Sequence, residues 1–163
     1  MVTPDAQRTM STYLGISQKL NASDINKEVI SHSKITYLEG YLWDLDDAQK
    51  AIKKAIKIAK DAGKIVAFSV SDVFCIERFR ESFLDLVNNE ANIIFSNEEE
   101  IKSLYQKDNL GDCLKIIKQQ NKIFAITLGE KGAIIINKDE EIQINAQKIE
   151  KLVDTTGAGD LFA

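Results

Sequence analysis

The sequence has few of the residues on which metal centres and disulfide frameworks depend. Its 163 residues include two cysteines, one histidine and one proline. Cys75 and Cys113 are too few for a disulfide framework and too far apart for a CxxC metal motif. A single histidine, His32, argues against a zinc site and against a Ser-His-Asp triad. We therefore expect neither zinc chemistry nor histidine-dependent nucleophilic catalysis.

Long apolar runs and a strong charge bias are also missing. The longest apolar runs, such as residues 123–128, are far shorter than the roughly 20 residues that span a bilayer. No basic segment followed by an apolar stretch marks a signal peptide. The 21 basic and 25 acidic residues give a formal net charge of −4, which gives no electrostatic reason to bind nucleic acid or an anionic membrane. The sequence predicts a soluble, cytoplasmic protein.

Short apolar runs alternate with segments of helical periodicity from residue 35 onward. Apolar residues recur at three- and four-residue spacing from Leu45 to Ala59, which predicts a helix that ends near Gly63. Two more helices are predicted around Phe79–Val87 and Leu110–Ile117. Strands are predicted at Ile35–Leu42, Ile65–Val70, Asn92–Phe95 and Ile123–Leu128. Continuous apolar strands are typical of a parallel sheet covered by helices, so we predict an α/β layered fold.

Two segments interrupt this alternation. Ala133–Asn137 and Glu141–Asn145 flank a turn and predict a β-hairpin. At the start of the chain, Val2-Thr3 and Arg8–Leu14 flank the turn Pro4–Gln7. The chain opens inside this second hairpin and stops one turn into a helix. We therefore expect a fragment, with a partial hairpin at 1–14 and an incomplete α/β domain at 15–163.

The most specific segment is DTTGAGD, residues 154–160. The small residues Gly157, Ala158 and Gly159 let the backbone approach a ligand, and a helix N-terminus offers unpaired N–H groups. Such a site stabilises the charge that develops during phosphoryl transfer, and Asp160 in the first turn can accept the proton of an attacking hydroxyl. The alternative is an ordinary glycine turn whose aspartate and threonines cap a helix.

The segment DTTGAGDLFA resembles the C-terminal signature of the PfkB carbohydrate kinases, the ribokinase-like family. The resemblance implies that Asp160 is the catalytic base and that the amides of Gly157, Ala158 and Gly159 form the anion hole. It also implies that Asp154 and Thr156 lie near a monovalent cation such as K⁺ in some members. The fold implied is a three-layer ribokinase-like fold with a mostly parallel sheet, incomplete here, plus part of a β lid at the N-terminus.

Two further motifs follow the order of this family. Asn97 and Glu100 form an Asn-x-x-Glu motif after a strand; the resemblance places Asn97 near the nucleotide phosphates and Glu100 at the Mg²⁺ hydration shell, through water. Helix capping alone would explain the same two residues. The motif TLGEKGA resembles the family's Thr-x-Gly-x-x-Gly segment, which implies that Thr127, Gly129 and Gly132 line the ATP site. The alternative is a plain β-turn.

Other nucleotide motifs are excluded. The segment GEKG lacks the GxxxxGK[ST] pattern of a P-loop. A dinucleotide fingerprint fails because Phe162 occupies the third glycine position.

The N-terminal segment VTPDAQRTMSTYLG resembles the lid of the same family as it returns to the large domain. Together with YLEGYLWD and SDVFCIERFR, it is most similar to bacterial adenosine-kinase-like members. Arg8 is then a candidate phosphate-facing arginine; the alternative is an exposed lid residue. Lid strands often mediate dimers in this family, so a homodimer through the lid is a candidate assembly.

The resemblance predicts an ATP- and Mg²⁺-dependent phosphotransferase. It would transfer the γ-phosphate to a hydroxyl of a nucleoside such as adenosine or of a sugar. We expect the fragment alone to be inactive, because catalysis of phosphoryl transfer depends on positioning and electrostatics. The alternative is a non-catalytic, truncated kinase homologue that acts as a binding or oligomerisation module.

Overall fold

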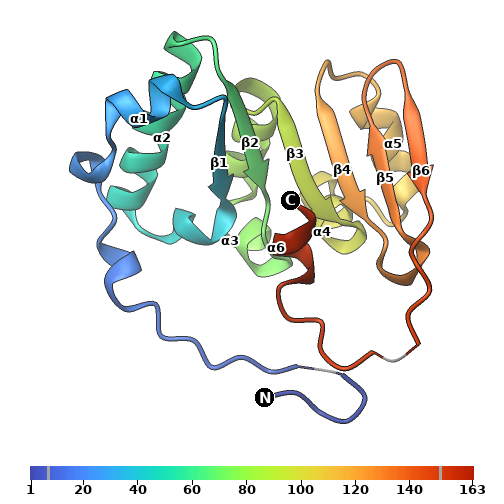
Figure 1. Ribbon diagram of the computed structural model, residues 1–163. Coiled ribbons are helices and arrows are strands. Elements are labelled where there is room, and N and C mark those ends of the chain that lie inside the picture. The colour runs from blue at the N-terminus through green and yellow to red at the C-terminus, as the bar shows by residue number, and fades with distance from the viewer. Residues whose placement is uncertain (7, 151) are drawn as a thin grey trace.

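A six-stranded sheet forms the centre of the protein (Figure 1). The computed structural model describes residues 1–6, 8–150 and 152–163. The strands lie side by side in sequence order; the first four are parallel, and the fifth runs antiparallel to its neighbours, the fourth and the sixth. They are β1 (Ile35–Glu39), β2 (Ile65–Ser69), β3 (Ile93–Asn97), β4 (Ile123–Thr127), β5 (Ala133–Ile136) and β6 (Glu141–Ile144).

The parallel strands are connected by α2 (Asp46–Asp61), α3 (Val73–Asp85), α4 (Glu98–Tyr105) and α5 (Leu110–Ile117). Helix α1 (Lys27–His32) precedes β1, and α6 (Ala158–Phe162) lies at the C-terminus. Sequence-adjacent parallel strands with right-handed crossovers place their connecting helices on the same side of the sheet. In Figure 1, α3, α4 and α5 accordingly lie behind the strands, whereas α6 lies in front of them. No helix within the described residues is long and apolar enough to cross a membrane.

The hydrophobic core lies between the sheet and α2–α5. One row of registered side chains, Leu38, Phe68, Ile94 and Phe124, points to this side and is buried. Alternate residues of a strand point to opposite faces, so this row belongs to one face only. Ile52 and Ile56 of α2 and Phe83 of α3 join the same core, which further residues of α4 and α5 complete. The predicted α/β fold with a mostly parallel sheet is confirmed.

Most element boundaries agree with the sequence, but the first strand is shorter than predicted. It ends at Glu39, and Gly40–Asp44 form a 3₁₀ turn instead of strand. A Cβ atom on Gly40 would lie 2.8 Å from the Phe83 ring and from the Val70 carbonyl oxygen. The chain therefore turns here so that the Gly40 backbone packs against α3. This close approach depends on tertiary contacts and is invisible in the apolar pattern.

The predicted N-terminal hairpin is reduced to one antiparallel bridge between Val2 and Arg8. The predicted strand at residues 8–14 is wrong, because no ladder extends beyond this bridge within the described residues. A two-stranded ribbon without a third strand or a packed face is marginal. Gln7, part of the predicted turn, lies outside the described residues. The C-terminal hairpin, by contrast, is confirmed as β5 and β6.

Candidate functional site

A small hollow of about 80 Å³ lies at the carboxyl ends of the parallel strands. The last residues of β1, β2, β3 and β4 all line it, namely Glu39, Ser69, Asn97 and Thr127. Helix α6 closes the hollow with Gly159, Asp160 and Phe162. Ligands of open parallel sheets bind at this edge because loops and helix N-termini converge there. The topology therefore brings the C-terminal signature to the ligand-binding edge.

The Asp160 carboxylate stands free in this hollow. Within the described part of the chain it accepts no hydrogen bond and makes no ion pair, although its charge acts on Tyr37 and Tyr41. Burial, with smaller contributions from Asp72 and other acidic groups including Asp160, raises the pKa of Tyr41 to about 12. A carboxylate without a partner remains available to accept a proton from a bound hydroxyl.

The glycines before Asp160 form the start of α6. Gly157 adopts the left-handed conformation with φ of 74°, which favours glycine. The Ala158 amide donates to the Thr155 carbonyl oxygen at 3.2 Å. The amides of Gly159 and Asp160 belong to the first helical turn, where helical geometry provides no partner. In this conformation these last two amides are better placed for an anion than the Ala158 amide.

Asn97 and Glu100 form a reciprocal capping box at the start of α4. The Glu100 amide donates to Asn97 Oδ1 at 2.8 Å, while the Asn97 amide and Nδ2 donate to the Glu100 carboxylate at 2.8 and 2.6 Å. The capping alternative is thus confirmed, but both residues also line the hollow. Glu100 is only 8% exposed, and burial raises the pKa of its carboxyl group because the charged form loses solvation, although the hydrogen bond from the Asn97 amide opposes this change.

The Thr-x-Gly-x-x-Gly segment connects β4 to β5 by a tight turn and lines a second hollow of about 390 Å³. Thr127, Gly129 and Gly132 all contribute to it. Thr127, Gly159 and Phe162 are shared with the first hollow, so the two spaces adjoin along α6. The segment is therefore a tight turn that also lines a hollow.

Four of the predicted residues line neither hollow, namely Gly157, Arg8, Asp154 and Thr156. One Arg8 guanidinium nitrogen donates to the Thr155 carbonyl oxygen at 2.6 Å and also contacts Thr155 Oγ1 at 3.2 Å. Asp154 accepts hydrogen bonds from the amide and hydroxyl of Thr156 at 2.8 and 2.7 Å, which hold its pKa below the ordinary value. Arg8 thus fastens the loop before the glycines, and the Asp154–Thr156 contact shapes that loop.

Several lining residues were absent from the sequence predictions. Tyr41 donates its hydroxyl hydrogen to the Ser71 carbonyl oxygen at 3.1 Å. Ser71 itself has a φ of 71°, a conformation that a serine seldom adopts and that concentrates at functional sites. Glu39 and Ser69 are polar residues at the ends of apolar strands, and this position in the sequence could have indicated that they line the site. The contribution of Tyr41 and Ser71 depends on tertiary structure and had no such signal.

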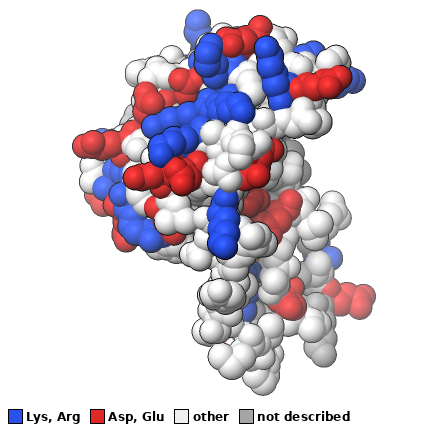
Figure 2. All heavy atoms as spheres, turned by 90° about the vertical axis from the view of Figure 1, so that its left-hand side faces the viewer, with Lys and Arg blue, Asp and Glu red and all other residues white. Residues whose placement is uncertain are grey.

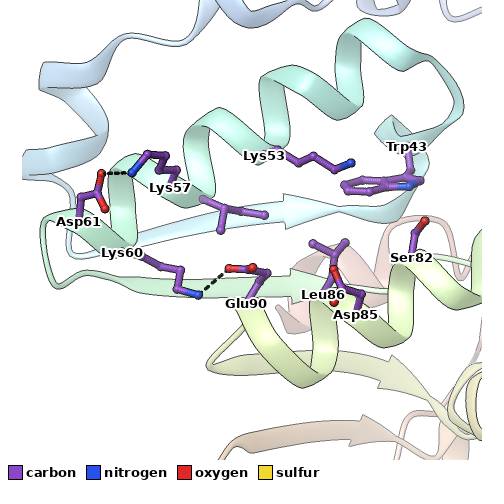
Figure 3. Close-up of a pocket in the computed structure, with 10 residues that line it drawn as sticks. Trp43, Lys53, Lys57, Lys60, Asp61, Ser82, Asp85, Leu86 and Glu90 are labelled. Carbon is purple, nitrogen blue, oxygen red and sulfur yellow. Dashed lines mark hydrogen bonds and ion pairs between the residues drawn. The ribbon is translucent and has the colours of Figure 1, made fainter.

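A larger cavity of about 440 Å³ lies elsewhere, between α2 and the turn after α3 (Figure 3). None of the motif residues lines it. Two of its lysines are already neutralised, because Lys57 pairs with Asp61 at 2.8 Å and Lys60 with Glu90 at 2.6 Å. Figure 2 shows the same mixture of positive and negative side chains over this side of the molecule. The smaller hollows at the strand ends are therefore the candidate site.

Comparison with known proteins gives a consistent result. The family described as pfkB family carbohydrate kinase matches residues 1–163. Adenosine kinase from Sinorhizobium meliloti matches with a TM-score of 0.94 and 40% identity, over 99% of this chain and 50% of that chain. A probable sugar kinase protein from Rhizobium etli CFN 42 matches with a TM-score of 0.94 and 43% identity, over 99% and 49% of the two chains.

Among curated proteins, Probable fructokinase-5 from Arabidopsis thaliana is 29% identical over 148 residues, which cover 88% of this chain and 45% of that protein. The chain spans about half the length of the relatives it matches.

Proposed function

Because the chain belongs to the pfkB family of carbohydrate kinases, we propose that it carries the proton acceptor and the nucleotide-facing motifs of a kinase. The reaction is transfer of the γ-phosphoryl group of ATP to a hydroxyl of a nucleoside such as adenosine, or of a sugar. The observation that carries the proposal is the position of the free Asp160 carboxylate. It shares one hollow with Asn97, Glu100 and the first turn of α6.

The proposed chemistry begins at the Asp160 carboxylate. Asp160 accepts the proton of the acceptor hydroxyl as the hydroxyl oxygen bonds to the γ-phosphorus. The bond between that phosphorus and the bridging oxygen of ADP breaks in the same displacement. The Gly159 and Asp160 amides, at the start of α6, stabilise the negative charge that spreads over the transferring oxygens. Phe162 and Phe95 give the same hollow an apolar side.

The residues present also fit a nucleotide with Mg²⁺. Mg²⁺ is held in kinase sites by one or two carboxylates together with water and substrate phosphates, and Glu100 and Asp160 supply two carboxylates to one hollow. No group of three or more His, Cys, Asp or Glu side chains among the described residues forms a cage for an ion. When bound, Mg²⁺ neutralises phosphate charge. Glu100 would contact it through water, and Asn97 would approach the phosphates.

Solved relatives support these ligand classes. An Escherichia coli protein with this fold was solved with ATP and Mg²⁺, and a Vibrio cholerae fructokinase with fructose, ADP and a potassium ion. Thr127, Gly129 and Gly132 would line the nucleotide side of the site. A role for Asp154 and Thr156 near a monovalent cation, and for Arg8 near phosphate, remains part of the proposal. It would require the loop at residues 154–156 to rearrange, because these side chains now bond within or to that loop.

The test uses a complete kinase, because the chain spans half of its relatives' length. This chain would replace the matching half of the Sinorhizobium meliloti adenosine kinase, with which it shares 40% identity. Asp160→Asn should lower kcat for adenosine about 10²- to 10⁴-fold, because it removes the proton acceptor. The dissociation constant for ATP should stay within about threefold, since the amides remain.

Asp139→Asn is the matched control, because Asp139 lies in the exposed β5–β6 turn, away from both hollows. It should leave kcat unchanged. Turnover by Asp160→Asn at the unsubstituted rate would contradict the assignment of the base.

A further inference from the structure

The cavity of about 440 Å³ between α2 and the turn after α3 has an apolar floor and a charged rim (Figure 3). Its floor consists of Trp43, Ile56 and Leu86, which are 2, 4 and 4% exposed. The volume lies within the roughly 300–1,000 Å³ that is typical of small-molecule sites. An apolar floor of this kind favours a ligand with an apolar body over a simple ion.

The wall of the cavity on the side of α3 has an irregular backbone. Phe79 within α3 has φ and ψ of −129° and 27°, which are not helical values. After Asp85 the chain continues as one π-helical turn, Leu86–Glu90, and the first and last residues of this turn line the cavity. Single π-helical turns are rare and occur frequently at functional sites. The helix therefore departs from regular geometry at the cavity itself.

The charged side chains around the cavity differ between its two ends. At one end, two lysines of α2 each pair with a carboxylate, and Figure 3 draws both contacts. At the end near Trp43, Lys53 and Asp85 form no ion pair with any described residue. The Lys53 ammonium lies 5.7 Å from the centre of the Trp43 ring, and Asp85 Oδ1 accepts a hydrogen bond from the Asn89 side chain at 2.7 Å. One cation and one carboxylate are therefore available at the same end.

These charges indicate which ligand would be complementary to the cavity. The lining carries three lysines and three carboxylates, so it has no net charge and favours neither anions nor cations as a class. A carboxylate of the ligand can accept a hydrogen bond from Lys53, and an ammonium group can donate one to Asp85; both bonds are charge-assisted. A simple anion would instead meet the Asp85 carboxylate, and a simple cation would meet Lys53. A ligand that carries both charges avoids each repulsion.

We propose that this cavity binds a small zwitterion with an apolar body, of the class of α-amino acids with aromatic or large aliphatic side chains. The cavity shares no lining residue with the two hollows at the strand ends, so the proposal does not rest on the kinase reaction. The 3₁₀ turn Gly40–Asp44 supplies Trp43 to the cavity and Tyr41 to the smaller hollow. A bound amino acid would therefore contact an element that also lines the candidate active site.

The test uses the fluorescence of Trp43, which is the one tryptophan of the chain and lines the cavity. The chain is titrated with L-phenylalanine, with excitation at a wavelength that phenylalanine does not absorb. We expect a saturable change in the Trp43 emission. Phenethylamine lacks the carboxylate of phenylalanine, and hydrocinnamate lacks the ammonium group. Each should bind at least about fivefold more weakly, because one charge-assisted hydrogen bond is lost.

Two substitutions test the charged partners. Lys53→Met and Asp85→Asn should each weaken the binding of L-phenylalanine at least about fivefold, because each removes one charged partner. Lys50→Met and Glu81→Gln are the matched controls, since they remove the same kinds of charge from α2 and α3 at positions that do not line the cavity. Their affinities should remain within about twofold of that of the unsubstituted chain.

Three results would overturn the proposal. The first is Trp43 emission that does not change up to the solubility limit of L-phenylalanine. The second is equal affinity for phenethylamine or hydrocinnamate, which would show that one of the two charges is not recognised. The third is binding that Lys53→Met and Asp85→Asn weaken no more than their controls do, which would place the ligand elsewhere. If a variant fails to fold by circular dichroism, the three ligands titrated into the unsubstituted chain decide between support and refutation.

Discussion

Gly132 illustrates how a single position can require glycine for two reasons. Its φ is 99°, outside the range that other residues ordinarily adopt. A Cβ atom there would also collide with the Ile144 carbonyl oxygen and lie 2.6 Å from the Ala146 amide nitrogen. The last glycine of the Thr-x-Gly-x-x-Gly segment thus lets β6 and the following chain pack against the turn that lines the second hollow.

Gly132→Ala should therefore destabilise the fold strongly. We expect a loss of at least about 3 kcal/mol in the free energy of unfolding in urea, from backbone strain plus collision with backbone atoms that cannot move aside. Gly63→Ala is the matched control, because Gly63 also has a positive φ but no atom near its missing Cβ. It should cost about 1 kcal/mol. Equal losses would show that steric contact at Gly132 is unimportant.

Glu100 makes stability depend on pH in a defined direction. Burial raises its pKa above the ordinary 4.5, so the folded state holds this proton more tightly than the unfolded state. As pH rises above about 4.5, the unfolded chain ionises first and the free energy of unfolding falls until the folded-state pKa is passed. Glu100→Gln removes this titration. We therefore expect the free energy of unfolding of the Glu100→Gln variant, minus that of the unsubstituted chain, to increase from pH 4 to pH 7 in urea unfolding.

Glu99→Gln serves as the control for this pH dependence. Glu99 adjoins Glu100 in sequence, but its side chain is 74% exposed and pairs with Lys102. Its unfolding curves should follow those of the unsubstituted chain across the same pH range. Parallel pH profiles for Glu100→Gln and the unsubstituted chain would contradict a raised pKa at Glu100.

Helix α4 shows how one short motif can serve both folding and the candidate site. The capping box fixes the first turn of α4 at the carboxyl end of β3, and this placement points Asn97 and Glu100 into the hollow. Good capping chemistry and a phosphate-facing role require the same orientation of the helix N-terminus. For this reason the two interpretations of Asn-x-x-Glu do not compete.

Removing the cap should test how strongly α4 depends on it. Asn97→Ala should lower the free energy of unfolding by about 2 kcal/mol, because the helix loses its cap and the buried Glu100 loses a hydrogen bond. Asn109→Ala is the matched substitution at α5. Asn109 caps this helix on the exposed surface, where its Oδ1 accepts a hydrogen bond from the Asp112 amide at 3.0 Å. It should cost about 1 kcal/mol. A larger loss for Asn109→Ala would contradict the role given to Glu100 burial.

Across the molecule, the two ends of the chain meet through Arg8. The guanidinium of Arg8 spans 147 positions in sequence to reach Thr155, in the loop that precedes the glycines. This contact ties the N-terminal arm to the signature segment. In Figure 1 the N-terminal arm and the loop before α6 both run below the carboxyl ends of the parallel strands, on the side where α6 begins.

Arg8→Ala should loosen this loop without unfolding the domain. We expect subtilisin to cleave residues 152–157 several-fold faster, while the urea midpoint of the core stays unchanged, because Arg8 is exposed and lies outside the core. Arg80→Ala is the control: its Nε donates to the Ser103 carbonyl oxygen within the helical layer at 3.2 Å. Unaltered cleavage at residues 152–157 in Arg8→Ala would show that the Arg8 contact does not hold the loop.

The sequence by itself determined the fold class, the order of the elements and the motifs at the strand ends. Apolar periodicity is a local property, so α2, the parallel strands and the β5–β6 hairpin follow from it. Asn97 was expected to begin a helix and does so. Glycines and an aspartate at the start of α6 were likewise recognisable from spacing and from resemblance to the pfkB family.

Only the tertiary structure decided which residues meet. The 3₁₀ turn at Gly40 replaces strand because Phe83 and Val70, distant in sequence, leave no room for a side chain. Tyr41 and Ser71 meet at the hollow through a hydrogen bond from the Tyr41 hydroxyl to the Ser71 carbonyl oxygen, which joins residues 30 positions apart in sequence. Arg8 bonds to Thr155, a partner 147 positions away that no local pattern indicated. These outcomes depend on contacts between distant segments, which a local pattern cannot encode.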